Sequence, residues 1–172
     1  MEEIIRIPHD RIGALIGSDG KTKKTIELKT KTKIEVDSEN GEITVFGEGE
    51  EFFKATDIVK AIARGFSPLR AFALFKEWNV LKIIEIQEFT GKNSSKQKAR
   101  RGRVIGKGGL AREQIEKKTN SLISVQGKTV AIIAREEDMR VAEAAIEMLL
   151  EGAKHETTTR FINRAQTERF EL

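Results

Sequence analysis

Ile16-Gly17-Ser18-Asp19-Gly20 recurs 89 residues later as Ile105-Gly106-Lys107-Gly108-Gly109. The same offset places Ile26 on Ile115, Ile34 on Ile123 and Val36 on Val125, so the apolar pattern after each loop is repeated too. An internal repeat with a glycine loop at its centre indicates one structural module used twice. Because a glycine loop that opens a helix is suited to phosphate, the module is expected to bind a phosphate-bearing ligand.

Each copy predicts the element order β-α-α-β-β-α. In the first copy we expect strands at 2–8, 33–37 and 42–46, and helices at 10–16, at 21–31 and from Phe52 to Gly65. The second copy is expected to begin with a strand at 80–87, to carry a polar insert at 90–98 and to end in a helix that reaches Leu150. Beyond Val125 it is expected to be three residues shorter, so that the hairpin turn Asn40-Gly41 corresponds to Gln126-Gly127.

The chain is therefore expected to have four parts, since two modules of this size fit within 172 residues. These are a first domain at 1–66, a packed helical linker at 67–79, a second domain at 80–152 and a C-terminal tail at 153–172 that forms one more helix.

Composition is that of an ordinary globular protein, with 38% hydrophobic and 34% charged residues. Cysteine is absent, which excludes disulfides and thiolate metal sites and favours a reducing compartment. Residues 1–20 alternate charged and apolar residues, and no stretch approaches the roughly 20 apolar residues that span a bilayer. We expect a cytoplasmic protein with no membrane partner.

Positive charge is concentrated around the second loop. Between Lys92 and Lys118 there are ten basic and two acidic residues, a local balance of +8. Because the whole chain has a net charge of +4, the remainder carries −4. A basic block around a glycine loop is typical of a surface that binds a polyphosphate backbone. A solvated, lysine-rich face is the alternative interpretation of such a block.

The two loops differ in their middle residues, which are Ser18-Asp19 in the first and Lys107-Gly108 in the second. Two like charges about 4 Å apart repel by roughly 1 to 4 kcal/mol, so Asp19 should weaken phosphate binding. Lys21, Lys23 and Lys24 partly offset this charge. The second domain is thus predicted to be the principal binder and the first a weaker contact, a scaffold or a protein-binding face. Alternatively, Asp19 caps the following helix, which would make its charge less repulsive.

Other motifs fit less well. Gly20-Lys21-Thr22 resembles the end of a P-loop, but that motif requires glycine where Leu15 stands. Gly106-x-Gly108-x-x-Ala111 satisfies a relaxed dinucleotide fingerprint, yet a basic helix precedes it instead of a buried strand. The two histidines, His9 and His155, have no second ligand-type residue at metal spacing. We therefore expect no catalytic residue, no metal and no cofactor.

An apolar residue, Gly-x-x-Gly between two helices, a hairpin and a closing helix together resemble the K-homology (KH) domain of the first, eukaryotic-type topology. The resemblance implies an α+β fold of two tandem type I KH domains, each with a three-stranded antiparallel sheet packed against three helices. It also implies that the loop clamps the backbone of about four nucleotides of single-stranded RNA while the bases occupy an adjacent groove.

Carried onto this sequence, the resemblance implies two sets of RNA-binding residues. The principal set lies in the second domain and consists of Arg100, Arg101, Arg103, Val104, Ile105, Gly106, Lys107, Gly108, Gly109, Arg112 and Ile123. The secondary set lies in the first domain and consists of Gly17, Ser18, Gly20, Lys21 and Lys24.

Over almost the whole chain, the arrangement is similar to the small-subunit ribosome assembly factors called Dim-two or Pno (partner of Nob). The basic helix from Lys96 to Arg103 and the tail Lys154-His155-Glu156-Thr157 support this likeness. It implies binding to the 3′ region of small-subunit rRNA, as companion of the endonuclease that cuts it and the dimethyltransferase that modifies it. We expect the protein to be a monomer. Two alternatives stay open: a KH subunit of an RNA processing, degradation or transcription complex, and a protein-interaction scaffold with weak RNA binding.

Overall fold

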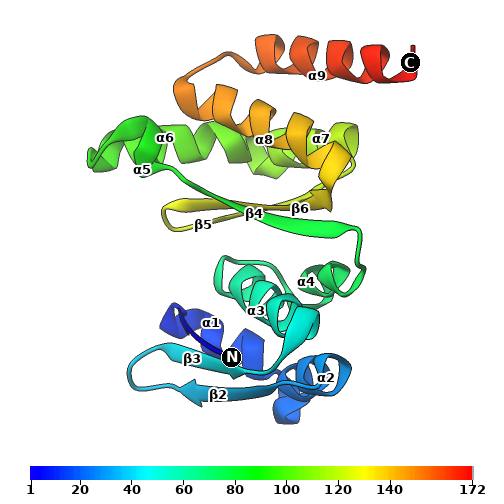
Figure 1. Cartoon of the computed structure of the whole chain (residues 1–172). Helices are drawn as coiled ribbons and strands as arrows, with labels where there is room; N and C mark the ends of the chain where they lie inside the picture. Colours follow the sequence, from blue (N-terminus) through cyan, green and yellow to red (C-terminus); the bar gives the residue numbers. More distant parts are fainter. Residues whose placement is uncertain (172) are drawn as a thin grey trace. The chain divides into compact units, whose positions relative to one another are not determined.

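Each copy of the repeat folds into a three-stranded antiparallel sheet with helices on one face (Figure 1). The computed structural model describes residues 1–171. They divide into two compact units, of which the first is Met1–Glu77 and the second begins at Trp78. Of the residues expected as a linker, 67–79, those as far as Glu77 therefore belong to the first unit.

The first unit contains the six predicted elements in the predicted order. They are β1 (Glu2–Arg6), α1 (His9–Ile16), α2 (Lys21–Thr30), β2 (Lys33–Asp37), β3 (Glu42–Phe46) and α3 (Gly49–Ala63). The strand order is β1-β3-β2, which leaves β1 at an edge, as expected for a strand followed by Pro8. Two short helices, α4 (Pro68–Ala71) and η2 (Phe72–Phe75), follow α3 and pack against it. Ser67 caps α4 by accepting a hydrogen bond from the Arg70 main chain at 3.3 Å.

The second unit repeats this arrangement and extends it. Its elements are β4 (Asn79–Glu85), α5 (Gln87–Thr90), α6 (Ser94–Ile105), α7 (Leu110–Thr119), β5 (Leu122–Gln126), β6 (Thr129–Arg135), α8 (Glu136–Glu151) and α9 (His155–Phe170). The strand order is β4-β6-β5. Helix α8 places Ala142, Ala145, Ile146 and Leu149 on one face, in the core. Helix α9 lies against α8 and α7 on the side away from the sheet (Figure 1).

Helix α6 begins earlier than expected. The polar stretch 90–98 was predicted to be an insert, but Ser94 already starts the helix. Asn93 caps it, because its side-chain oxygen accepts a hydrogen bond from the Lys96 main chain at 3.0 Å. Gln97 is buried and donates to the Gly91 carbonyl at 2.8 Å, so the polar residues at this end of the helix are used locally.

The predicted difference between the two hairpins is wrong by one residue. Asp37 pairs with Glu42 in the first hairpin, and Gln126 pairs with Thr129 in the second. The first turn therefore has four residues (38–41) and the second has two (127–128), a difference of two and not three. Gln126 belongs to strand β5, because strand pairing continues to it instead of stopping at Val125.

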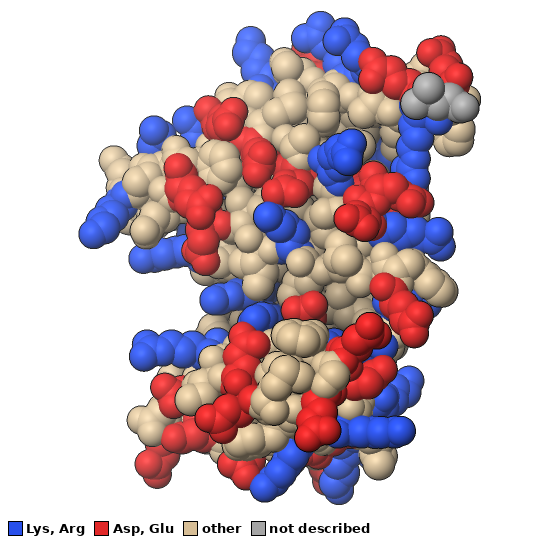
Figure 2. Space-filling model, viewed as in Figure 1, with Lys and Arg blue, Asp and Glu red and all other residues tan. Residues whose placement is uncertain are grey.

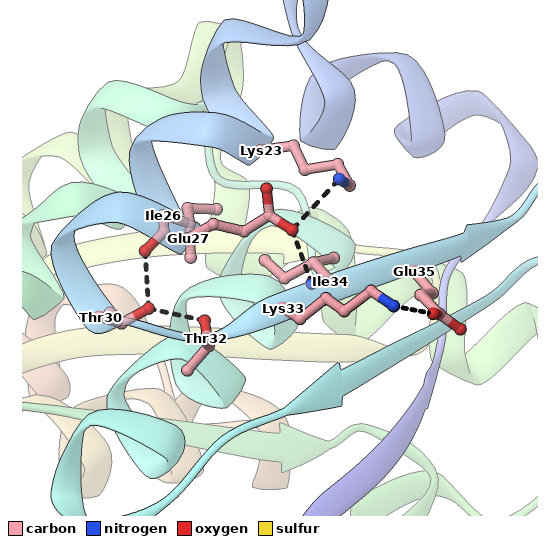
Figure 3. Close-up of polar contacts among 8 residues, drawn as sticks. All are labelled: Lys23, Ile26, Glu27, Thr30, Thr32, Lys33, Ile34 and Glu35. Atoms are coloured by element: carbon pink, nitrogen blue, oxygen red, sulfur yellow. Dashed lines mark hydrogen bonds and ion pairs between the residues drawn. The ribbon is translucent and has the colours of Figure 1, made fainter.

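Polar contacts at the end of the second helix of each copy are repeated as faithfully as the apolar core. The Thr30 hydroxyl donates to the Ile26 carbonyl at 2.6 Å and lies 2.7 Å from the Thr32 hydroxyl (Figure 3). At the matching positions, Thr119 donates to the Ile115 carbonyl at 2.7 Å and lies 2.7 Å from Ser121. The residues between them, Lys31 and Asn120, both adopt a left-handed conformation. These contacts fix the turn from helix to strand in both units.

Asp57 on α3 is expected to make stability depend on pH. Burial raises the pKa of this carboxyl above its ordinary value of 3.8, and Lys60 opposes that rise. Because the native pKa is raised, the unfolded chain ionises first as the pH increases, so the free energy of unfolding falls between 3.8 and the native pKa. Asp57→Asn should therefore stabilise the protein at neutral pH and have little effect at acidic pH, which urea titrations at the two pH values would measure. An equal effect at both would contradict this explanation.

Candidate nucleic-acid interface

The two glycine loops have the same backbone geometry. Gly17 and Gly106 have φ of 75° and 73° with ψ of 174° and 179°. Their N–H groups donate to the carbonyls of Gly13 and Gly102 at 2.9 and 2.8 Å. The fourth residue of each loop then donates to the first, at 3.2 Å in one loop and 3.3 Å in the other. The repeat seen in the sequence is thus also a repeat of loop conformation.

The first glycine of each loop is required by geometry. Its backbone lies in a region that is essentially restricted to glycine. A Cβ atom on Gly17 would lie 2.3 Å from the Thr22 hydroxyl, and one on Gly106 would lie 2.5 Å from the Ala111 Cβ. In both loops the following helix therefore passes directly against the first glycine, which brings the start of that helix to the loop.

The helix after each loop directs its first turn toward the loop without a side-chain cap. Gly20 and Gly109 occupy the N-cap positions of α2 and α7 in a left-handed conformation. Asp19 makes no capping hydrogen bond and is exposed, so the interpretation of Asp19 as a helix cap is wrong. An uncapped helix start presents main-chain N–H groups and the positive end of the helix dipole, both of which favour an anion.

Exposed lysines stand beside both loops. In the second loop Lys107 is exposed at the position next to Gly106. In the first, Lys21 and Lys24 are exposed, and a Cβ on Gly20 would lie 3.8 Å from the Lys24 side chain. None of these three lysines makes an ion pair with another of residues 1–171. The loop residues of both predicted sets are therefore brought together with available positive charge.

Beside each loop, a basic residue and a glutamate connect the second helix to the following strand. In the first unit, the Glu27 carboxylate accepts hydrogen bonds from Lys23 at 3.2 Å and from the Ile34 main chain at 2.8 Å (Figure 3). In the second, Arg112 pairs with Glu116 and donates to the Ile123 carbonyl at 3.4 Å. Arg112 belongs to the principal set expected to bind RNA, and in the structure its charge is shared with Glu116 beside the edge strand β5.

The three arginines of α6 are placed differently from one another. Arg101 donates to the Gly127 carbonyl at 2.7 Å, which ties the helix to the β5–β6 turn. Arg103 is half-buried and donates from one nitrogen to the carbonyls of Gly152 and Ala153 at 2.7 and 2.6 Å. Arg100 lies against the same segment, since a Cβ on Gly152 would meet its guanidinium at 2.3 Å. Arg103 therefore holds α6 against the end of α8, and Arg100 lies beside it.

Arg103 is expected to contribute to stability as well as to charge. Replacing it with Ala should lower the free energy of unfolding by about 1 to 3 kcal/mol, because two carbonyls at the end of α8 lose a charged donor. Arg103→Lys keeps the positive charge, but its ammonium ends one bond short of the guanidinium nitrogen that makes both contacts. This variant should therefore also lower stability, while it retains the charge that attracts RNA. Urea unfolding and RNA titration of both variants would separate the two contributions, and unchanged stability of Arg103→Ala would contradict the role in packing.

Two predicted contacts have their side chains in the core. Val104 is 0% exposed and Ile123 is 1% exposed, and both belong to the apolar cluster of the second unit. A side chain that is this buried cannot contact RNA without a change of conformation, so packing explains these two residues. Ile105, beside Gly106, is half-buried and lies at the end of α6.

Charge differs between the units. The first unit has a net charge of −1 and the second of +5. On the face drawn in Figure 2, basic and acidic side chains are interspersed. Among residues 1–171, no three His, Cys, Asp or Glu residues form a metal-binding group. Within the same residues, no helix is both long and apolar enough to span a membrane.

Sequence reasoning missed a group of residues around the start of α9. His155 contacts the Arg103 carbonyl through Nε2 at 2.8 Å, and Arg169 near the other end of α9 pairs with Asp138 at 2.6 Å. These contacts hold the C-terminal helix beside α6, α7 and α8. The sequence signal was limited to a helical pattern after Gly152, which says nothing about where the helix packs.

Comparison with known proteins agrees with this geometry. Residues 80–167 match a family model described as a eukaryotic-type (type I) KH domain, and residues 2–61 match a KH-domain model. A KH domain-containing protein from Methanocaldococcus jannaschii is 42% identical over 179 residues, which cover 99% of this chain and 78% of that protein. The crystal structure of Dim2p from Pyrococcus horikoshii is 44% identical, with a TM-score of 0.86 over 95% of this chain and 99% of that one.

A chain in the a/eIF2alpha-aDim2p-rRNA complex of the same organism is 42% identical, with a TM-score of 0.90 over 98% of this chain and 95% of that one. The likeness therefore extends over both KH domains and also over the C-terminal helix. The chain belongs to the Dim2/Pno1 family of tandem type I KH-domain proteins.

Proposed function

We propose that this protein is an RNA-binding ribosome assembly factor without a reaction of its own. The observation that carries the proposal is the Gly106–Gly109 loop, which adjoins the start of α7 and carries the exposed Lys107 within a segment of net charge +8. Main-chain N–H groups, a helix dipole and a lysine at one place suit the phosphates of a single strand. The complex of aDim2p with rRNA in Pyrococcus horikoshii supports the same ligand class.

The RNA that we propose is the 3′ region of small-subunit rRNA. A fluorescence-anisotropy titration would compare that 3′ end with a scrambled RNA of equal length at two salt concentrations. We expect preference for the rRNA end and an affinity that falls linearly with salt on logarithmic axes, because each phosphate contact releases counterions.

Each outcome of this titration has a distinct meaning. Equal affinity for both RNAs would reduce the proposal to a general KH-type RNA binder. An affinity that does not respond to salt, or no binding at all, would overturn it in favour of a protein-interaction scaffold.

For the first domain we propose a weaker RNA contact. Its loop has the same backbone as the second loop, but Asp19 occupies the position of Gly108. A carboxylate there repels phosphate by roughly 1 to 4 kcal/mol at about 4 Å, depending on the effective dielectric.

Asp19→Lys should therefore strengthen RNA binding by about tenfold or more at low salt. The left-handed backbone is no obstacle, since Lys31 adopts φ of 51° in this chain. Titration with RNA in a variant whose second loop is inactivated would isolate the contribution of the first loop. Asp19→Asn removes the negative charge without adding a positive one, so it would separate the loss of repulsion from the gain of attraction. If both variants bind like the parent, the first loop takes no part in RNA binding.

As protein partners we propose the endonuclease and the dimethyltransferase of small-subunit maturation. The relative from Pyrococcus horikoshii assembles with a/eIF2alpha and rRNA together, which supports a protein that binds RNA and a protein partner at once. Size-exclusion chromatography of the chain with each candidate, in the presence and absence of the 3′-end RNA, would test these partners. A monomer of the free chain is the expected starting state.

A further inference from the structure

The second unit contains a cavity of about 340 Å³ between α7 and α9, on the other side of α7 from strand β5. Arg112 and Glu116 are one turn apart on α7 and face β5, where Arg112 contacts Ile123. Ala111, Gln114 and Lys118 form a different stripe of the same helix and line the cavity. The cavity therefore adjoins a different face of α7 from the one that contacts β5. We assign the KH groove, which the family likeness places beside the loop, to the β5 side, so the cavity is separate from it.

The glycine loop itself forms one edge of the cavity. Gly106 and Lys107 are among its lining residues. Apolar side chains form much of the rest, namely Leu110, Ala111, Ile115, Leu149 and Ile162. The last three are buried, so this part of the wall belongs to the packed core and is preformed.

The remaining lining residues are polar or basic. Lys107 and Lys118 contribute positive charge, while Gln114, Thr159 and His155 contribute donors and acceptors. No lining residue is acidic. His155 is held in place by its contact with the Arg103 carbonyl at 2.8 Å. An apolar wall with a basic rim fits a ligand that has a flat apolar ring and a negatively charged backbone.

The cavity belongs to the second unit because helix α9, which forms one of its walls, follows α8 there. In the first unit, the chain after α3 forms α4 and η2, which pack against α3. In the second unit, the chain after α8 turns back and lies along both α8 and α7. Thr158, Thr159 and Ile162 of α9 thereby supply one wall. The C-terminal helix thus adds a binding surface beside a loop that the two units otherwise share.

We propose that the cavity between α7 and α9 binds the base of a nucleotide that flanks the phosphates held by the Gly106–Gly109 loop. The RNA strand passes over the loop and places bases on both sides of α7, in the KH groove and in this cavity. The volume is near the lower end of the range for ligand pockets, which suits one base. This inference rests on the proposed RNA binding and adds a nucleotide to the about four that a KH domain holds.

The test compares an RNA that fills the KH groove with the same RNA extended by one or two nucleotides at each end. In the native protein the extension should raise affinity by about five- to tenfold, as expected when about 50 Å² of apolar surface leaves water as one base is buried against apolar side chains. Replacing each extended base in turn with an abasic site should identify the position that provides the gain.

Two variants obstruct the cavity. Gln114→Trp fills it from an exposed position on α7, and Thr159→Phe fills it from α9. Both should remove the gain from the extension and leave binding of the short RNA unchanged. The matched control is Thr25→Trp, which places the same side chain at the corresponding position of α2 in the first unit. A variant whose melting temperature falls is set aside, and the other then decides.

Charge gives an independent test on the same helix. Lys118→Gln should reduce the gain from the extension, whereas Lys117→Gln, next to it but outside the cavity lining, should not. If native protein and cavity variants gain equally from the extension, the cavity does not bind RNA, and an apolar side chain of a protein partner becomes its better occupant. If the native protein binds neither RNA in a salt-dependent manner, the proposed function itself has failed.

Discussion

Replacing Lys107 and Gly108 together with Asp should weaken RNA binding by about 100-fold or more at low salt. The change removes one positive charge and places two negative charges at the loop, and each like-charge pair near 4 Å costs roughly 1 to 4 kcal/mol. Anisotropy titration over a salt series measures the effect. The dependence on salt should also become shallower, by about 0.7 in the logarithmic slope for each phosphate contact that is lost from a single strand.

The fold should tolerate this double substitution, because the first loop already has an aspartate at the position of Gly108. Asp19 adopts φ of 53° and ψ of 29°, and Gly108 adopts 62° and 20°. A Cβ on Gly108 would meet nothing within 4 Å, and Lys107 is exposed. The melting temperature should therefore stay close to that of the parent. Unchanged affinity in a folded variant would remove the second loop from the mechanism.

Gly106→Ala should have the largest effect on stability among the glycines of the second loop. Its φ of 73° and ψ of 179° lie where side chains are strained by about 1 to 3 kcal/mol. The new Cβ would also lie 2.5 Å from that of Ala111, which cannot move without shifting α7. We expect the free energy of unfolding of the second unit to fall by about 3 kcal/mol. Urea titration followed by fluorescence of Trp78, the single tryptophan and part of this unit, measures it.

Two neighbouring glycines provide graded controls. Gly109→Ala meets strain from φ of 79°, but its nearest atom is 3.9 Å away, so it should cost less, about 1 kcal/mol. Gly102 lies within α6 and has free space around it, so Gly102→Ala should stabilise by about 0.4 to 1 kcal/mol. Equal losses at Gly106 and Gly109 would show that contact with α7 contributes nothing.

The repeated local pattern predicted the elements well because each of its signals acts over a few residues. The offset of 89 residues correctly aligned not only apolar positions but also Thr30 with Thr119 and Lys23 with Arg112, whose contacts recur in the structure. The hairpin was misaligned by one residue because turn residues are exposed and carry no core pattern. The predicted start of helix α6 was too late, because the first turn of the helix is polar and resembles a loop in the sequence. The structure shows that Asn93 caps the helix.

Contacts between distant segments could not be predicted in this way. The family resemblance gave Arg103 and Lys107 the same role, yet Arg103 is bonded to carbonyls 49 and 50 residues away while Lys107 is exposed. Val104 and Ile123 were predicted to contact RNA, but their side chains complete the core. Charge and hydropathy state what a side chain prefers, whereas its neighbours decide whether it is available to a ligand.

By itself, the sequence determined the number of modules, their topology, the two glycine loops and the excess of positive charge around the second. These follow from local rules, since the period of apolar residues selects helix or strand and glycine permits the backbone that the loops need. The tertiary structure alone decided which arginines are engaged in packing, that Asp19 is exposed and does not cap α2, and that α9 forms a cavity beside the second loop. The contacts of Arg103 and the cavity depend on where α8 ends and how the chain turns back at Gly152, which no local pattern specifies.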